Sequence, residues 1–145
     1  MSHIFLSVFL SLTPSVWSPP RFVAPVVAPI YDHFRPPACS WCPGNRGIDY
    51  AAEPGGQVHA AASGVVEFAG PVGKSLFVVV RHPDGLRTTY GFLQAVSVTA
   101  GLGVATGDVV GRSGSDLHFG VRRGDTYLDP EPFLAGQRLK ARLVA

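Results

Sequence analysis

The sequence of 145 residues predicts an all-β domain whose strands run antiparallel. Three observations predict this fold class. Glycine and proline are abundant, with 17 Gly and 13 Pro, while only 15% of the residues are charged. Turn signals recur roughly every 8–12 residues, which is the spacing of short strands in an antiparallel sandwich or barrel-like sheet. No stretch of the sequence shows the apolar periodicity of a helix over three turns.

The expected strands are runs of β-branched, aromatic and other apolar residues bounded by turn-forming residues. The run at 75–81 is continuously apolar in its middle, which favours a central strand. Pro83 and Gly85 then favour a tight turn, because Pro presets φ and Gly accepts a positive φ. The expected strands cover residues 57–62, 65–69, 75–81, 86–93, 108–111 and 117–121, and short helices are expected at 131–134 and 137–143.

Residues 1–18 form an apolar leader that has several features of a signal peptide. The stretch from Ile4 to Leu12 has the length of a signal-peptide core and is too short to span a bilayer as a helix. Neither Lys nor Arg precedes it, and Trp17 stands where a cleavage site has a small residue. The alternatives are a wrongly assigned start or a disordered apolar leader. We expect export to the cell envelope or beyond, with no stable membrane span after the leader is removed.

The segment after the leader is rich in proline. Seven of the 13 prolines lie between residues 14 and 37, and this density opposes both helix and central strand. We therefore expect residues 19–37 to be an extended linker, residues 38–137 to be the β domain and residues 138–145 to be a basic tail. On this interpretation the chain before about residue 30 packs poorly on the domain.

Charge and cysteine content restrict the partners and the cellular compartment. The net charge of +2 is too small to argue for nucleic-acid binding. Cys39 and Cys42 are spaced for a small-loop disulfide, a redox pair or half of a zinc site. No βαβ pattern surrounds them, which argues against a thioredoxin-like site. In an exported protein a simple disulfide is the expected state.

One hairpin has a competing interpretation. Residues 98–108 resemble the hairpin of biotinyl and lipoyl carrier domains. Those carriers attach their cofactor to a lysine at the tip of a turn, and this sequence has no Lys between Lys74 and Lys140. The carrier interpretation therefore fails, and the hairpin is expected to be structural.

A series of short signatures resembles one family throughout residues 44–134. The series consists of Gly47-Ile-Asp-Tyr-Ala-Ala52, Gly56-x-Val-x-Ala-Ala-x-Ser-Gly-Val-Val66, Asp84-Gly-Leu-x-Thr-x-Tyr90, Gly107-Asp-Val-Val-Gly111, Leu117-His-Phe-Gly-Val-Arg122 and Tyr127-Leu-Asp-Pro130. Their order resembles that of the lysostaphin/LytM-type peptidoglycan metallopeptidases (peptidase family M twenty-three). The resemblance implies that family's antiparallel, duplicated-hybrid-motif-like β fold, and it implies a zinc metalloendopeptidase ancestry.

The resemblance also implies where the functional residues should lie. The family holds zinc with a His-x-x-x-Asp pair and with the second histidine of His-x-His, which leaves one coordination position for water. Asp49 and His118 match two of the three ligands. The first ligand position is Asn45, the first position of His-x-His is Asp116, and the histidine of a Tyr-x-His-Leu strand is replaced by Phe92.

These replacements predict a weakened site. An amide is a poor zinc ligand beside imidazole, and losing one of three ligands removes several kcal/mol of a total of roughly 10–16 kcal/mol. Phe92 cannot move a proton, and the charge of Asp116 opposes a developing oxyanion. We therefore expect weak or no zinc binding, with Asp49, His118 and Asn45 as remnant metal positions and Asp116 as the candidate catalytic group. Asp116 could instead serve as a replacement ligand.

Three functions follow as hypotheses. The first is a non-catalytic wall module that binds peptidoglycan or regulates a wall hydrolase. The second is an active zinc metalloendopeptidase, in which Asp116, or Cys39 and Cys42, help Asp49 and His118. The third is a purely structural secreted β domain, whose groove would be filled by Phe92 and its neighbours.

The strand pattern also predicts the geometry of the groove. Its floor should be the strands at 75–82, 86–93 and 116–122. Since side chains alternate across a strand, Leu117 and Phe119 should face away from His118. By the same alternation, Tyr90 and Phe92 should share one face, and Phe92 should lie on the face of His118.

Overall fold

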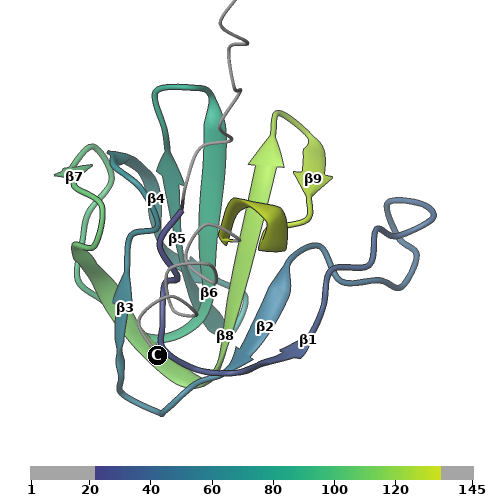
Figure 1. The fold of residues 1–145 in the computed structure, drawn as a ribbon. Coiled ribbons are helices and arrows are strands. Elements are labelled where there is room, and N and C mark those ends of the chain that lie inside the picture. Colours follow the sequence, from purple (N-terminus) through teal and green to yellow (C-terminus); the bar gives the residue numbers. More distant parts are fainter. Residues whose placement is uncertain (1–21, 135–145) are drawn as a thin grey trace, which may run out of the picture.

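The computed structural model describes residues 22–134, and it confirms the predicted all-β antiparallel fold (Figure 1). All nine strands belong to one sheet, and residues 131–134 form one helical turn. Expected features at 1–21 and 135–145, including the leader and the basic tail, lie outside the described residues. The strands are β1 (Ile30–Asp32), β2 (Ile48–Ala51), β3 (Gln57–His59), β4 (Gly64–Val72), β5 (Ser75–Arg81), β6 (Leu86–Val96), β7 (Gly103–Val104), β8 (Val109–Arg123) and β9 (Thr126–Leu128).

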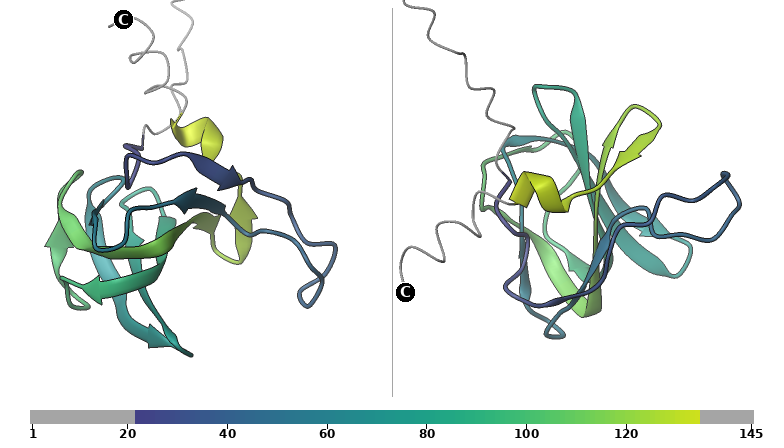
Figure 2. Two further views of the ribbon diagram at one scale, coloured as in Figure 1. Left: turned by 90° about the horizontal axis from the view of Figure 1, so that it is seen from below. Right: turned by 45° about the vertical axis from the view of Figure 1, so that its right-hand side comes forward.

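The sheet is organised around β8. Its strand order is β1-β2-β8-β6-β5-β4-β7, and β3 and β9 also pair with β8. Every pairing is antiparallel, and the sheet curves strongly, as the two views in Figure 2 show. Because β8 lies between β2 and β6, residues from three distant parts of the chain meet on its surface.

The two strands expected at 108–111 and 117–121 are one continuous strand. β8 runs through Ser113, Gly114 and Ser115, which were expected to separate them. Small residues in this stretch let a second segment approach closely. Ser113 Oγ donates a hydrogen bond to the carbonyl of Glu53 at 2.7 Å, and the amide of Gly55 donates one to the carbonyl of Ser113, also at 2.7 Å. Contacts to another part of the chain therefore accompany a continuous strand where the local sequence predicts an interruption.

The core lies on one face of the sheet and follows the alternation of β5, β6 and β8. The side chains of Leu117 and Phe119 are fully buried, whereas His118 between them is only partly buried on the other face, as predicted. Tyr90 is the largest fully buried side chain and packs on Phe119, with ring centroids 5.6 Å apart. Its hydroxyl accepts hydrogen bonds from the amide of Ala61 at 2.7 Å and from Thr88 Oγ1 at 2.9 Å. The polar end of Tyr90 is therefore satisfied inside an apolar core.

The expectation that the chain before residue 30 packs poorly is wrong for the described part of that segment. Phe22 is only 2% exposed and stacks on Phe133 with ring centroids 5.0 Å apart. The amide of Phe22 donates a hydrogen bond to the carbonyl of Phe133 at 3.0 Å. The amide of Val23 donates one to the carbonyl of Ala61 at 2.9 Å. The proline density excludes helix and central strand but leaves carbonyls free to accept bonds from the sheet edge. The prolines therefore oppose helix and central strand in this segment, but they do not prevent it from packing on the domain.

The loop between β1 and β2 projects from the sheet and carries both cysteines (Figures 1 and 2). Cys39 and Cys42 form a disulfide with Cα atoms 4.9 Å apart. Trp41 within this small loop is 87% exposed. Among residues 22–134, no helix has the length and apolar character needed to cross a bilayer.

Candidate functional site

The centre of the candidate site is a pair of residues on adjacent strands. Asp49 of β2 and His118 of β8 are register partners in the antiparallel ladder. His118 Nδ1 lies 2.9 Å from Asp49 Oδ1, and both side chains are largely shielded from solvent. A carboxylate at this nitrogen fixes the orientation of the ring and leaves Nε2 directed away from the pair. The two positions that match family ligands are therefore adjacent in space.

Asn45 joins this pair from the loop before β2. Its Nδ2 donates a hydrogen bond to Asp49 Oδ2 at 2.7 Å, and its Oδ1 accepts one from the amide of Gly47 at 3.3 Å. The backbone of Asn45 bridges to Arg35, which holds the loop against the end of β1. Asn45, Asp49 and His118 thus form a continuous chain of hydrogen bonds, in which both oxygens of Asp49 are occupied.

Phe92 lies on the same face as His118, with ring centroids 5.9 Å apart. The expectation that Phe92 shares a face with Tyr90 is wrong, because the pairing of β6 with β8 is irregular between Gly91 and Leu93. Phe92 has φ of 60°, in the left-handed region that costs a residue with a side chain roughly 1–2 kcal/mol. This bulge turns Phe92 outward, where it is 45% exposed, while Tyr90 points into the core. The ring of Phe92 also meets that of Phe77 at 5.8 Å.

Asp116 is placed beside the site and not at its centre. It pairs with Ala51 across β2 and β8, one alternation before His118. Its neighbour is Tyr31 of β1. The pKa of Tyr31 is raised above its ordinary value, mainly by desolvation and secondly by a hydrogen bond to Asp116. Sequence reasoning missed Tyr31 because it lies in the segment expected to be a linker. Its β-favouring aromatic character was the signal that could have identified a strand there.

An open pocket of about 370 Å³ exposes this arrangement to solvent. Asn45, Asp49 and His118 line it together with Phe92, whereas Asp116 does not. Asp32 also lines the pocket and was not anticipated from the sequence. It forms an ion pair with Arg35, and the hydrogen bond from Arg35 holds the pKa of Asp32 below its usual range. The carboxylate of Asp32 is therefore already neutralised by a cation.

The side chains present do not fit a tetrahedral zinc ion as they are arranged. Zinc needs lone pairs from at least three protein ligands, but Asn45 turns an N–H donor toward Asp49. Within residues 22–134, no group of three or more His, Cys, Asp or Glu side chains could hold a metal. The sulfurs of Cys39 and Cys42 are bonded to each other and offer no thiolate. In this structure Asn45, Asp49 and His118 are linked by hydrogen bonds.

Comparison with known proteins identifies the family. The model of "Peptidase family M23" matches residues 43–130, which is more than half of the chain. The chain belongs to peptidase family M23. The resemblance to lysostaphin/LytM-type M23 peptidases is thereby confirmed.

Individual M23 relatives are similar over different parts of the chain. An uncharacterized protein of Mycobacterium tuberculosis is 35% identical over 119 residues, covering 73% of this chain and 46% of its own. The "DD-carboxypeptidase/endopeptidase Mpg" of Neisseria meningitidis is 44% identical over 94 residues, covering 59% of this chain and 22% of its own. This chain therefore spans at most about half of the length of these relatives.

A solved structure provides the third comparison. A chain from the structure of the SpoIIQ–SpoIIIAH pore forming complex superposes with a TM-score of 0.70 and 26% identity. The match covers 81% of this chain and 92% of that one. The M23 fold thus occurs in proteins named as peptidases and in a protein assembly.

Proposed function

We propose that this M23 domain binds peptidoglycan at the groove above β8 without hydrolysing it. The main support for this proposal is the pair of contacts made by the carboxylate of Asp49. The carboxylate of Asp49 accepts from Asn45 on one oxygen and contacts His118 on the other, at 2.7 and 2.9 Å. A peptidase of this family needs those same positions to hold zinc and a water molecule. Here the three side chains satisfy one another, so the groove keeps its shape without the group that supplies the chemistry.

The surroundings of this chain of hydrogen bonds support binding in place of catalysis. Phe77 and Phe92 form an apolar edge of the pocket beside His118. An apolar wall with a few fixed polar groups is the usual composition of a ligand site. Neither aromatic ring can donate a proton or stabilise a negative oxygen. The groove can therefore orient a peptide, and with Asn45 in place of a third ligand it lacks the zinc site by which this family activates water.

Purified sacculi provide the test. The folded domain should sediment with sacculi at low salt and release no soluble peptides during long incubation, with or without added zinc. Phe77→Ala should weaken sedimentation, because Phe77 lines the pocket. Phe68→Ala is the matched control, because Phe68 on β4 is also partly exposed, at 39%, and lines none of the groove pockets. Absence of sedimentation would refute the proposal, and so would release of peptides.

Regulation of a wall hydrolase is the second form of the proposal. It is supported by the likeness of this fold to a chain of the SpoIIQ–SpoIIIAH complex, since that M23-like chain belongs to a protein assembly. Addition of the domain to a purified wall hydrolase should then change the rate at which sacculi are cleared. An unchanged rate, together with sedimentation of the domain on sacculi, would favour simple wall binding.

A rebuilt zinc endopeptidase is the alternative function. Asp116 is the residue that could complete it, but Asp116 does not line the pocket that Asn45, Asp49 and His118 share. Elemental analysis of the protein after zinc incubation and desalting distinguishes the two. Stoichiometric zinc with peptide release would establish the alternative, and protein without zinc would exclude it.

Export is also a proposal, and the disulfide supports it. Disulfides such as Cys39–Cys42 persist mainly in oxidising compartments outside the cytoplasm. A wall-binding role requires the same location. Labelling of free thiols in freshly isolated protein should find Cys39 and Cys42 unreactive, and reactive thiols would contradict export.

A further inference from the structure

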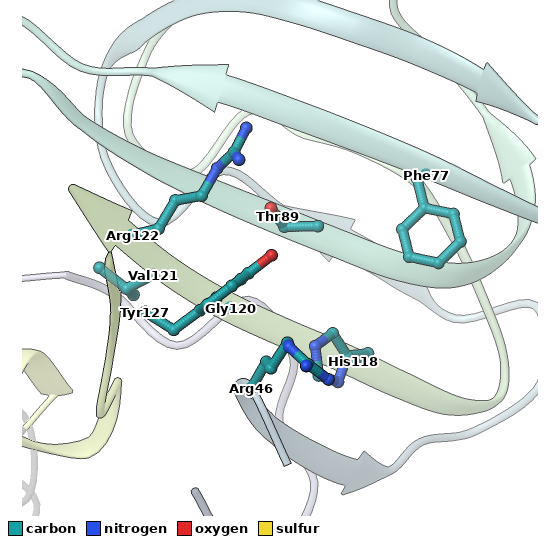
Figure 3. A pocket seen from close by; sticks show the side chains of 8 residues that line it. All are labelled: Arg46, Phe77, Thr89, His118, Gly120, Val121, Arg122 and Tyr127. Carbon is teal, nitrogen blue, oxygen red and sulfur yellow. The ribbon is translucent and has the colours of Figure 1, made fainter. Parts of the chain in front are cut away.

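A second pocket adjoins the first along the outer face of β8 and has a different character. It has a volume of about 190 Å³ and is more enclosed than the groove beside Asn45. His118, Gly120 and Arg122 contribute to it from alternate positions of β8 (Figure 3). The other lining residues are Arg46, Phe77, Thr89, Val121 and Tyr127.

Two arginines border this pocket, and no carboxylate of the described residues forms an ion pair with either of them. Arg46 donates to the carbonyl of Ser40 at 2.7 Å and lies over the ring of Tyr127, 5.8 Å from its centroid. These contacts hold the side chain in place without neutralising it. Arg122, like Arg46, is partly buried.

Two neighbouring arginines, by contrast, are paired with carboxylates. Arg87, the register partner of Arg122 on β6, forms a two-pronged pair with Glu67 through bonds of 2.7 and 3.0 Å. Arg35 is paired with Asp32. Arg46 and Arg122, which line one small pocket, have no such carboxylate partner among the described residues, and neither does the exposed Arg123 beside them.

Gly120 keeps the floor of the pocket open. A Cβ atom built at this position would lie 3.7 Å from Thr89 Cβ, 3.7 Å from the carbonyl oxygen of Arg46 and 3.8 Å from His118 Nε2. These are ordinary contact distances, so a methyl group would fit without moving the backbone. Because Gly120 lines the pocket, the methyl group would reduce its volume. The absence of a side chain here creates room for part of a ligand.

We propose that this pocket binds a carboxylate of a peptidoglycan peptide, held between the guanidinium groups of Arg46 and Arg122. The inference rests on the proposed function, because it names which chemical group of the wall polymer the domain recognises. Guanidinium groups bind carboxylates through paired, charge-assisted hydrogen bonds. The half-buried position strengthens such bonds relative to those of fully exposed arginines. The aromatic rings of Phe77 and Tyr127 would contact the peptide that carries the carboxylate.

The first test uses a matched pair of peptides. Acetyl-D-Ala-D-Ala with a free carboxylate and the same peptide ending in an amide are titrated into the folded domain by calorimetry. The acid should bind about tenfold more tightly or better, because only the acid can accept charge-assisted hydrogen bonds from the guanidinium groups; tenfold corresponds to ~1.4 kcal/mol. Inorganic phosphate is titrated as a third probe, because phosphate groups of other wall polymers also bind arginine. Equal binding of acid and amide would overturn the proposal, and so would binding of phosphate without the acid.

Three variants test whether this pocket causes the preference for the acid over the amide. Arg122→Gln should abolish the preference for the acid over the amide, and Gly120→Ala should weaken acid binding by filling the pocket. Arg123→Gln is the control: Arg123 is the next residue on β8, is exposed, donates to the carbonyl of Asp84 at 3.1 Å and does not line the pocket. It should retain the preference. Loss of the preference in Arg123→Gln, or its survival in Arg122→Gln, would overturn the assignment.

Sedimentation with sacculi separates this inference from the proposed function. If the parent sediments and Arg122→Gln sediments equally well, wall binding stands and the carboxylate pocket fails. If the parent binds the acid peptide in preference to the amide but does not sediment, the pocket stands and wall binding fails. Weaker sedimentation of Arg122→Gln than of Arg123→Gln would support both.

Discussion

Asp49 Oδ1 and His118 Nδ1 lie 2.9 Å apart across the β2–β8 ladder, although 69 residues separate them in the sequence. Asn45 approaches the other oxygen of the same carboxylate at 2.7 Å. Asn45 lies four residues before Asp49, where the resemblance to the family predicts a ligand histidine. The site is arranged so that one substitution would change a hydrogen-bond donor into a metal ligand.

Asn45→His should create a zinc site. The new imidazole, Asp49 and His118 would supply three ligands and leave a position for water. Zinc affinity should rise by orders of magnitude, because a third ligand adds several kcal/mol and each ~1.4 kcal/mol is tenfold. Calorimetry measures the affinity, and zinc should also raise the melting temperature of the variant. Asn45→Ala is the control and should bind zinc no better than the parent. A well-folded Asn45→His variant without improved zinc binding would refute the alignment of this position.

Restored metal binding alone should not restore hydrolysis. On the predicted alignment, Asp116 and Phe92 still replace the two histidines that assist the reaction in the family. Asn45→His should therefore release few peptides from sacculi, and adding Asp116→His should increase release more than it increases zinc affinity. Peptide release by the single variant at the rate of the double variant would show that Asp116 is not limiting.

Gly47→Ala should disrupt the alignment of the site. A Cβ atom at Gly47 would lie 2.3 Å from the carbonyl oxygen of Phe119, and this contact is with backbone that cannot rotate away. The variant should lose a few kcal/mol of unfolding free energy, because the β2–β8 ladder that holds Asp49 against His118 must separate. Gly120→Ala, two residues beyond His118 on β8, is the matched control, because its Cβ meets only ordinary contacts. Urea denaturation compares the two, and equal stability would contradict the close approach at Gly47.

Because Tyr90 is buried, the free energy of unfolding should fall at strongly alkaline pH. Burial raises the pKa of Tyr90 to about 12, above the ordinary value of 10.0. The folded protein therefore retains the phenolic proton more tightly than the unfolded chain does. This contribution is present below pH 10 and is lost as the pH rises from 10 toward 12, by up to roughly 3 kcal/mol. Denaturation at a series of pH values measures it.

Tyr90→Phe is the control for that alkaline transition. It should remove this part of the pH dependence, while costing about 1–3 kcal/mol at neutral pH because the amide of Ala61 loses its acceptor. An identical alkaline loss of stability in parent and variant would show that another group is responsible.

Phe22→Ala should destabilise the domain by about 3–5 kcal/mol, the usual cost of removing a buried aromatic side chain. Phe22 is 2% exposed and contacts the rings of both Phe133 and His82. Val27→Ala, only five residues away but fully exposed, should leave the melting temperature nearly unchanged. An unchanged melting temperature in Phe22→Ala would restore the linker interpretation of this segment.

Much of the fold and of the site follows from the sequence by itself. Turn residues at regular intervals and strand-forming runs between them specify antiparallel pairing, since both act through local backbone geometry. Alternation within 117–119 correctly placed His118 opposite the core. The signatures around Asp49 and His118 predicted one site for both residues, and the structure brings them together. That Asn45, Asp116 and Phe92 are substituted positions stays a prediction.

Tertiary structure decided the features that depend on contacts between distant segments. The bulge at Phe92 lies where the register between β6 and β8 shifts, and no local sequence pattern predicts it. Phe22 joins the core because Phe133 offers a ring to stack on. Arg46 and Arg122 line one pocket because Arg46 lies just before β2, and β2 is the neighbour of β8 in the sheet. Local sequence determines which conformations are available to each segment, whereas burial and pairing, which need the whole sheet, select among them.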